Sequence, residues 1–348
     1  MFQGIDFFSD TVTKPTAAMR KAMVAAEVGD EQRQEDPTTL QLEELLAEHL
    51  GFSAALFFPS ATMANEIALR CMSHPGDELL AADSSHLFLA ETGGPAVHAQ
   101  LMCRPIPTKA GVFGAQDIKA YYHDIKSVNH PISRLLSVEN TTNFGGGLPW
   151  SGQQLQEVVA CANELNLKKH MDGARIFNAS VKTGMPVKAI AAGFDMVTIC
   201  LSKGLGCPVG AVLAFDKAHF PQVRRYKQLM GGAMRQTGIL AAAGIYALQH
   251  HVARLQEDHD HATQLANALA GMGPSIQVLN DPPATNIVLF TWHSTKLTMA
   301  DFSQRCIQKG VRFSQIGANT LRAVTHLDIS SHDIKKAVQI LQEVLASV

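Results

Sequence analysis

An excess of charge of either sign is the first feature that this sequence lacks. Among 348 residues, 29 are lysine or arginine and 31 are aspartate or glutamate, which gives a formal net charge of −2. Charged residues make up only 17% of the chain. This balance gives no overall electrostatic attraction for nucleic acid or for an anionic membrane surface. We therefore expect neither as a partner.

Long apolar runs and paired cysteines are lacking too. No run of 18 apolar residues occurs, so a transmembrane helix is not expected. The N-terminal MFQGIDFFSDTVTKP has neither the basic nor the long apolar region of a secretory signal. The six cysteines are scattered without a Cys-x-x-Cys pair, which is typical of free thiols in a reducing compartment. We expect a cytoplasmic protein.

Several common catalytic signatures do not occur. The sequence contains no HExxH motif and no Cys/His spacing typical of zinc ligands, so no metal site is predicted. A GxGxxG turn after a strand, a P-loop and a GxSxG elbow are also missing. Nucleotide binding and serine-hydrolase chemistry therefore have little support.

The residues that are present predict an α/β protein with two domains. Hydrophobic residues make up 46% of the chain, enough for a large core. Candidate strands at 54–60, 134–140, 168–175, 196–204 and 210–215 alternate with helical patterns at 38–50, 61–72 and 152–167. This alternation favours a mostly parallel sheet. After a long helical stretch at 245–272 the pattern resembles a smaller α+β unit, so we expect domains at 1–245 and 246–348.

Lys203 is the first candidate for chemistry. It follows the apolar run MVTICLS, and ligands of such sheets bind beyond the carboxyl ends of strands. Partial burial lowers the pKa of a lysine and exposes an amine that can form a Schiff base. The alternative is a lysine whose stem lies at a strand end and whose ammonium reaches water.

Asp172 and Arg175, in the segment HMDGAR, favour the catalytic interpretation. A carboxylate at the end of a strand could keep the ring nitrogen of a pyridoxal cofactor protonated, which makes the ring an electron sink. The alternative for Asp172 is a helix cap or turn. Arg175 could bind a carboxylate through two hydrogen bonds, or form a surface ion pair.

A phosphate site and a ring-stacking residue are weaker candidates. Ser60, Ala61 and Thr62 precede a predicted helix, and a helix N-terminus with hydroxyl groups suits a phosphate. His86 could stack on a planar cofactor, although 15 histidines occur in the chain and any one could be a capping or core residue.

Taken together, these segments resemble the L-threonine aldolase family, including the low-specificity and L-allo-threonine aldolases. The resemblance rests on SDTVTKPT at 9–16, DPT at 36–38, SVENT at 137–141, DGARIFNA at 172–179, ICLSKGLGCPVG at 199–210, MRQTGILAAAGIYAL at 234–248 and VTHLD at 324–328. It implies a pyridoxal-phosphate enzyme of fold type I, which is aspartate-aminotransferase-like. Such a fold has a large domain with a mostly parallel sheet and a smaller α+β C-terminal domain.

The resemblance also implies roles for individual residues. Lys203 would bind pyridoxal 5'-phosphate covalently, Asp172 would pair with its ring nitrogen, His86 would stack on the ring, and Arg175 would lie near its phenolic oxygen. Other groups would surround the cofactor and substrate: Ser60, Ala61 and Thr62 at the phosphate; Ser9, Arg175 and Arg322 at the substrate carboxylate; Arg235 and Lys227 at a neighbouring subunit's site.

The implied reaction is cleavage of L-threonine, L-allo-threonine and related L-β-hydroxy-α-amino acids to glycine and an aldehyde. The base for the β-hydroxyl stays open between His86, His130 and a water molecule. β-Elimination or transaldol transfer is the alternative reaction, and a non-catalytic binding protein is a third reading. The family also implies a homotetramer with shared sites.

The chain departs from the family pattern in five places. Phe8 replaces a common arginine, residues 33–35 replace a Tyr-Gly-Asp-like stretch, Ala61 replaces a glycine, and Thr142 replaces a histidine. The segment 144–150, FGGGLPW, is also slightly expanded. Cofactor binding should survive these changes, whereas the substrate side chain and the diastereomer preference are open.

Overall fold

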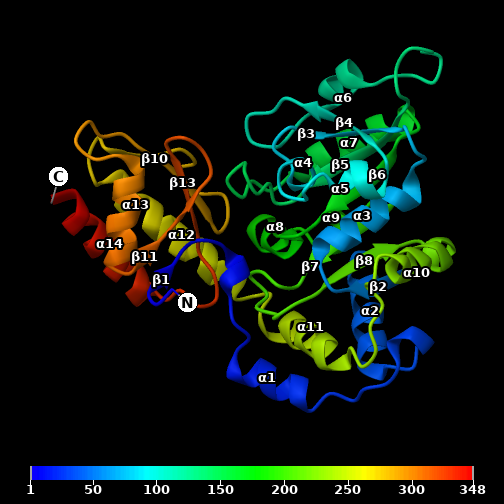
Figure 1. Cartoon of the computed structure of the whole chain (residues 1–348), viewed down its shortest axis with the longest axis horizontal. Coiled ribbons are helices and arrows are strands. Elements are labelled where there is room, and N and C mark those ends of the chain that lie inside the picture. Colours follow the sequence, from blue (N-terminus) through cyan, green and yellow to red (C-terminus); the bar gives the residue numbers. More distant parts are fainter. Residues whose placement is uncertain (1, 347–348) are drawn as a thin grey trace.

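A computed structural model describes residues 2–346 and contains two units that lie side by side (Figure 1). The larger unit is built on a seven-stranded sheet of order β2-β8-β7-β6-β5-β3-β4. Its strands are β2 (Ala54–Phe58), β3 (Glu78–Ala82), β4 (Met102–Ile106), β5 (Ser133–Glu139), β6 (Lys168–Asp172), β7 (Met196–Cys200) and β8 (Ala211–Phe215). Only β8 runs antiparallel to its neighbours, so the predicted, mostly parallel sheet is confirmed.

Both faces of this sheet are covered, which explains its uninterrupted apolar strands. Along β8, Val212 and Ala214 join one buried cluster, whereas Leu213 and Phe215 join the other. The helices that cover the sheet complete three layers. They are α2 (Pro37–Leu50), α3 (Ala61–Met72), α5 (Gly94–His98), α6 (Ala115–Tyr121), α7 (Gly152–Glu164), α8 (Ile176–Thr183), α9 (Val187–Ile190), α10 (Phe220–Leu229) and α11 (Gly238–His250).

Local capping explains where the helices near the site begin. Asp36 accepts a hydrogen bond from Thr39 N at 2.9 Å, and Pro37 occupies the first helical position of α2. Ser60 caps α3 in the same way through Met63 N at 3.2 Å. The short segments around them are α1 (Ala17–Val24), α4 (His86–Leu89), η1 (Asp10–Val12), η2 (Glu31–Arg33) and η3 (Lys217–His219).

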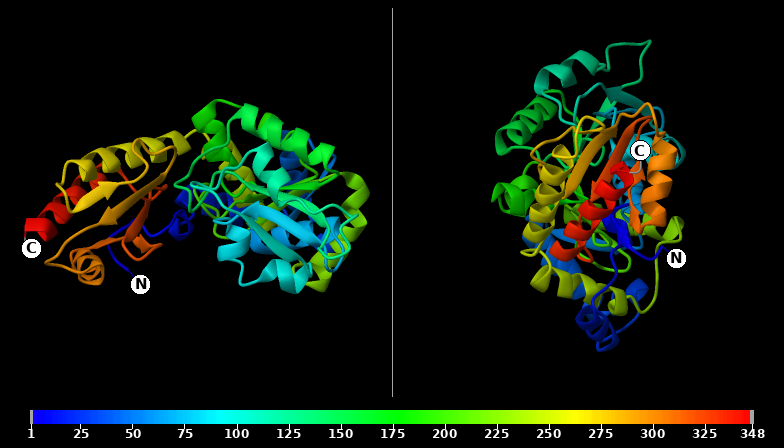
Figure 2. Two further views of the ribbon diagram at one scale, coloured as in Figure 1. Left: turned by 90° about the horizontal axis from the view of Figure 1, so that it is seen from above. Right: turned by 90° about the vertical axis from the view of Figure 1, so that its left-hand side faces the viewer.

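The smaller unit is an antiparallel sheet of order β12-β13-β10-β9 with helices packed on it (Figure 2). The strands are β9 (Ile276–Val278), β10 (Ile287–Trp292), β12 (Ser314–Gln315) and β13 (Thr320–Val324). Its helices are α12 (Leu255–Ala270), α13 (Met299–Gln308) and α14 (Ser331–Ala346). The predicted helical stretch at 245–272 is thus two helices, α11 and α12, with a break between them.

The N-terminus differs from the predicted division into domains. Strand β1 (Ile5–Asp6) pairs in parallel with β11 (Val311–Arg312), and Ile5 and Phe7 are buried in the core of the smaller unit. The first residues therefore belong to the C-terminal unit before the chain crosses to α1 beneath the larger one (Figure 1). No helix within residues 2–346 has both the length and the apolar character needed to cross a membrane.

Candidate active site

Polar residues gather where the strands of the larger sheet end. Glu139 and Asp172 are the last residues of β5 and β6, and Lys203 follows β7. Ser60 and His86 begin the helices that follow β2 and β3. These five strands point the same way, so their carboxyl ends form one edge of the sheet, where ligands of such folds bind.

Asp172 is a buried carboxylate that stays charged. Its Oδ2 accepts a hydrogen bond from Asn65 Nδ2 at 3.1 Å, and its Oδ1 accepts one from Ala174 N at 3.0 Å. Burial acts to raise the pKa of Asp172, but the nearby positive charges of His86 and Lys203 hold it below its ordinary value. The site therefore offers a negative charge to a protonated ring nitrogen.

His86 is held from two sides. Its backbone N–H donates to Glu139 Oε2 at 2.6 Å, and its Nδ1 lies 2.7 Å from Glu91 Oε1. Burial acts to lower the pKa of His86, but the hydrogen bond to Glu91 raises it above its ordinary value. Because Nδ1 faces a carboxylate, Nε2 is the ring nitrogen left for chemistry.

Lys203 is half-buried at this edge and has no carboxylate within ion-pair distance in the part of the chain described. Its positive charge nevertheless acts on Asp10, His86 and Asp172, which places its amine among them. An amine that no ion pair holds can attack a carbonyl carbon once it loses its proton.

Arg175 is already matched by a carboxylate. Its Nε donates to Asp10 Oδ2 at 2.7 Å, and its Nη2 donates to Asp10 Oδ1 at 2.8 Å. Both side chains are almost fully buried, and Arg175 holds the pKa of Asp10 far below its ordinary value even though burial acts to raise it. Only Nη1 of the guanidinium lies outside this ion pair, and it donates to Asn143 Oδ1 at 3.2 Å.

Arg322, on β13 of the smaller unit, forms no ion pair of this kind. Its guanidinium donates to Asn143 Oδ1 at 2.7 Å, Ser314 Oγ at 3.2 Å and the carbonyl oxygen of Phe8 at 3.5 Å. No carboxylate within residues 2–346 pairs with it, although its residue exposure is only 8%. Burial and repulsion by Arg175 lower its pKa to about 10. A buried guanidinium without a counter-ion favours the binding of an anion.

Ser9 lies beside these two arginines. Its Oγ accepts from Thr11 N at 3.2 Å and lies 3.4 Å from Asp10 Oδ1. The carbonyl of the preceding residue, Phe8, is the one that Arg322 reaches. The structure therefore brings together the three residues predicted at a substrate carboxylate, although Arg175 is shielded by Asp10.

The predicted phosphate turn is the N-terminus of α3. Ala61 and Thr62 occupy its first two positions and are partly exposed. The first N–H groups of a helix have no acceptor within the helix, so they suit an anion. This turn lies at the same edge of the sheet as Asp172 and Lys203.

His130 is not part of this arrangement. It precedes β5, whereas the site lies where β5 ends, and a seven-residue strand is roughly 20 Å long. Its Nδ1 lies 2.6 Å from Ser127 Oγ, and its ring lies 4.3 Å from that of His123. Within its own chain, His130 therefore lies at the end of β5 opposite to Glu139, away from the other predicted residues.

The structure places Lys227 and Arg235 against the segment around η2. Lys227 Nζ lies 2.5 Å from Glu31 Oε1, and Arg235 Nη1 lies 2.9 Å from Asp30 Oδ2. Lys227 is buried and lies over the Phe58 ring, whereas the Arg235 side chain is 60% exposed. Neither residue lies among the groups around Asp172 in this chain.

Comparison with known proteins identifies the family. The chain matches the family model described as Beta-eliminating lyase over residues 6–295. It is 39% identical to the low specificity L-threonine aldolase of Escherichia coli (strain K12), covering 95% of this chain and 96% of that protein. It is 34% identical to low-specificity L-threonine aldolase 1 of Arabidopsis thaliana, covering 100% and 98%. The chain belongs to the low-specificity L-threonine aldolase family. The predicted resemblance is confirmed.

Solved structures support the same fold for this threonine aldolase family member. The threonine aldolase of Leishmania major superposes with a TM-score of 0.84 at 20% identity, covering 98% of this chain and 99% of that one. The predicted fold type I architecture is therefore confirmed. Family membership also confirms the predicted class, a pyridoxal-phosphate-dependent carbon–carbon lyase.

The residues of the site fit pyridoxal phosphate. Besides Asp172 and Lys203, several buried polar atoms at this edge have no hydrogen-bond partner among the residues described. They are Ser85 Oγ, Asn140 Nδ2, Thr141 Oγ1 and Thr142 Oγ1. Buried polar groups are normally paired, so unpaired groups around a charged carboxylate indicate a polar ligand.

Sequence reasoning missed the residues that hold the predicted ones in place. These are Asp10, Asn65, Glu91 and Asn143. Asp10 lies inside the segment SDTVTKPT, which carries the resemblance. Asn65 and Glu91 carry no such signal, because their contacts join segments far apart in sequence.

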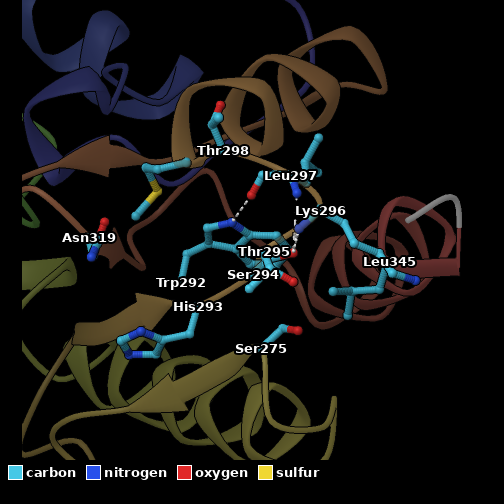
Figure 3. Close-up of a pocket in the computed structure, with 11 residues that line it drawn as sticks. Ser275, Trp292, His293, Ser294, Thr295, Lys296, Leu297, Thr298, Asn319 and Leu345 are labelled. Atoms are coloured by element: carbon cyan, nitrogen blue, oxygen red, sulfur yellow. Dashed lines mark hydrogen bonds between the residues drawn. The ribbon is translucent and has the colours of Figure 1, made fainter.

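A cavity in the smaller unit is separate from this site. It has a volume of about 780 Å³ and lies in the smaller unit, beneath the loop that joins β10 to α13 (Figure 3). The Trp292 indole N–H donates to the carbonyl oxygen of Leu297 at 2.8 Å and fixes this loop. No residue predicted at the active site lines this cavity.

Proposed function

We propose that this chain cleaves L-threonine, L-allo-threonine and related L-β-hydroxy-α-amino acids to glycine and an aldehyde at the edge of the seven-stranded sheet. The proposal rests on the family and on the residues gathered at that edge. When bound, pyridoxal phosphate supplies a carbonyl for a Schiff base and a ring that accepts the electron pair of the broken bond. All other tasks fall to side chains of the protein.

Arg322 is the observation that carries this proposal. Its buried guanidinium has hydrogen-bond donors and no carboxylate partner within residues 2–346, so it is complementary to the carboxylate common to all α-amino acids. Ser9 lies next to it. Binding of the carboxylate fixes the rotation of the amino acid, which determines the bond of Cα that is broken.

The larger unit supplies the remaining roles. Lys203 would provide the amine that holds the cofactor covalently. Asp172, charged and held by Asn65, keeps the ring nitrogen protonated. The N-terminus of α3, with Ser60, Ala61 and Thr62, receives the phosphate.

His86 is the proposed base for the β-hydroxyl group. Glu91 fixes its Nδ1 at 2.7 Å, so Nε2 is free to accept a proton. The hydrogen bond to Glu91 raises the pKa of His86, which makes the neutral ring a better proton acceptor. The same contact orients the ring, which supports its proposed place against the cofactor.

β-Elimination is the second candidate, because the matching family model is described by that reaction. Incubation of the purified, cofactor-loaded enzyme with L-threonine and L-allo-threonine separates the two. Acetaldehyde and glycine in equal amounts are expected for aldol cleavage. A 2-oxo acid with ammonia would contradict it and establish elimination. The ratio of the two rates gives the diastereomer preference.

We further propose a cytoplasmic homotetramer with shared sites, in which Arg235, and less directly Lys227, faces a neighbouring subunit. The high exposure of the Arg235 side chain and its contact with Asp30 support a position at a subunit interface. Sedimentation equilibrium is expected to give four times the mass of the chain. A monomer that is fully active would contradict this assembly.

A further inference from the structure

Two buried carboxyl groups lie side by side behind His86. Glu66, on α3, is 2% exposed, and no donor within residues 2–346 reaches either of its carboxylate oxygens. Glu91 is its neighbour. The site is closely packed, because a Cβ atom added at Gly94 would lie 2.2 Å from Glu66 Oε1. Three of the four carboxylate oxygens of Glu66 and Glu91 have no hydrogen-bond donor among the described residues.

The hydrogen bonds identify which of the two carries the charge. Glu91 Oε1 lies 2.8 Å from Asn65 Nδ2 and 2.7 Å from His86 Nδ1, both of which act as donors to a carboxylate. Glu91 Oε2 has no donor among the described residues. Two facing carboxyl groups cannot both ionise without a large cost, so one proton is shared. Glu91 is therefore the carboxylate, and Glu66 is the neutral acid that donates to it.

We propose that Glu66 is a positioning residue whose carboxylic acid hydrogen-bonds to Glu91 and thereby limits the basicity of His86. This inference rests on the proposed function, because the kinetic test of the inference requires that activity. A donor on Glu91 Oε2 spreads part of the negative charge away from Oε1. The Glu91–His86 hydrogen bond is then weaker than it would be with an unassisted carboxylate, and His86 Nε2 gives and takes its proton at a lower pH.

The charges around the pair agree with this assignment. Burial, with the charge of Glu91 as the next cause, raises the pKa of Glu66 to about 9. The other titratable groups that face it are the Cys103 thiol on β4 and, beyond Glu91, His86 and Asp172. Among these groups only His86 brings a positive charge, and Glu91 lies between it and Glu66.

The test compares Glu66→Gln with Glu66→Leu in the holoenzyme. The glutamine amide still donates to Glu91, so the pH profile of kcat/KM for L-threonine should follow that of the wild type. Leucine removes the donor. The acidic limb of the profile should then move up by about one pH unit, the size expected for one hydrogen bond to a charged group. A profile of Glu66→Leu that does not move would overturn the proposal.

Thermal melting gives a second readout that does not depend on catalysis. Because the folded-state pKa of Glu66 is raised from 4.5 to about 9, the folded protein holds this proton longer than the unfolded chain. Its contribution to stability therefore falls as pH rises through that window. The gain in Tm of Glu66→Gln over the wild type should grow from pH 5 to pH 9. A constant difference would contradict the shared proton.

Glu43 provides the matched control. It is also buried, burial raises its pKa to about 7, and it accepts a hydrogen bond from Phe57 N at 2.8 Å, away from His86. Glu43→Gln should change Tm mainly between pH 5 and pH 7 and leave the kinetic profile unmoved. If the wild type cleaves no β-hydroxy amino acid, the proposed function fails, while the melting curves still confirm or overturn the shared proton.

Discussion

The two units of the molecule each place one buried arginine beside Asn143, and the two arginines are used differently. Arg175, in the larger unit, has its guanidinium matched by Asp10 through two hydrogen bonds. Arg322, in the smaller unit, has only neutral partners within the described chain. The same side chain is therefore structural in one unit and available to a ligand in the other.

This difference indicates a division of labour between the units. The edge of the larger sheet contains the amine, the carboxylate and the imidazole expected around a cofactor. The smaller unit contributes a single charged side chain from β13. Asn143 connects them, because its Oδ1 accepts from both Arg175 and Arg322. The cofactor would bind to one unit, and the substrate carboxylate would bind to the other.

Loss of Lys203 should give the largest effect on the cofactor side. We expect Lys203→Ala to lower kcat by about 10⁴-fold or more, because the covalent step is lost. Cofactor should remain bound only non-covalently. Mass spectrometry after borohydride reduction checks this. An adduct that persists in Lys203→Ala would contradict the assignment of this lysine.

Asp10→Asn tests whether Arg175 is structural. The change leaves a buried guanidinium without its counter-ion, so the free energy of unfolding should fall by about 3–5 kcal/mol. Asp30→Asn is the matched control, because its partner Arg235 is largely exposed and such a pair contributes less than about 1 kcal/mol. Urea denaturation measures both. Equal stabilities of the two variants would remove the distinction between the arginines.

Lowering the pH should destabilise both units, because each contains a buried histidine that is neutral in the folded protein. Burial lowers the pKa values of His170 and His259 to about 4. These values lie below the ordinary 6.5. The contribution of each histidine to the free energy of unfolding is therefore fully present above pH 6.5 and is lost as pH falls towards 4. For His170 the loss reaches about 3 kcal/mol.

His170→Gln should reduce this acid sensitivity, because an amide can replace the imidazole towards Ser137 and Thr198 without titrating. The exposed His98, changed to glutamine, serves as control. Unfolding curves recorded between pH 4 and pH 7 check the prediction. Identical pH dependence in His170→Gln and the wild type would contradict it.

Ser9→Ala should give the smallest effect. Its hydroxyl contacts Asp10 and Thr11 N and carries no charge, so we expect KM for L-threonine to rise about tenfold, the size of one hydrogen bond. The affinity for pyridoxal phosphate should not change. Steady-state kinetics and cofactor titration measure the two separately. A loss of cofactor affinity instead would assign Ser9 to the cofactor site and not to the site of the substrate carboxylate.

The sequence alone predicted those residues of the site that directly follow or close an apolar strand. Asp172 is the last residue of β6 and Lys203 follows β7, at the strand ends that the pattern predicted. His130 came from the resemblance, and in this chain it precedes β5, at the strand end opposite to Glu139. Arg322 depended on resemblance, since nothing in its local pattern distinguishes it from a strand residue.

Contacts between distant segments account for what the sequence could not predict. The pairing of Ile5 with Val311 moves the N-terminus to the smaller unit, and no local pattern records it. Asn65 contacts Glu91 and Asp172, which are 26 and 107 residues away. The break between α11 and α12 contains neither glycine nor proline, the usual signals for the end of a helix.

The binding of glycine to the holoenzyme tests the division of labour most directly. Glycine retains the carboxylate and lacks the side chain, so its affinity reports the carboxylate site without any turnover. In Arg322→Ala we predict a Kd for glycine that is about 100-fold higher, with the Kd for pyridoxal phosphate unchanged, since a charged hydrogen-bonded pair contributes about 3 kcal/mol. Unchanged glycine binding, or an equal loss of cofactor affinity, would contradict the account.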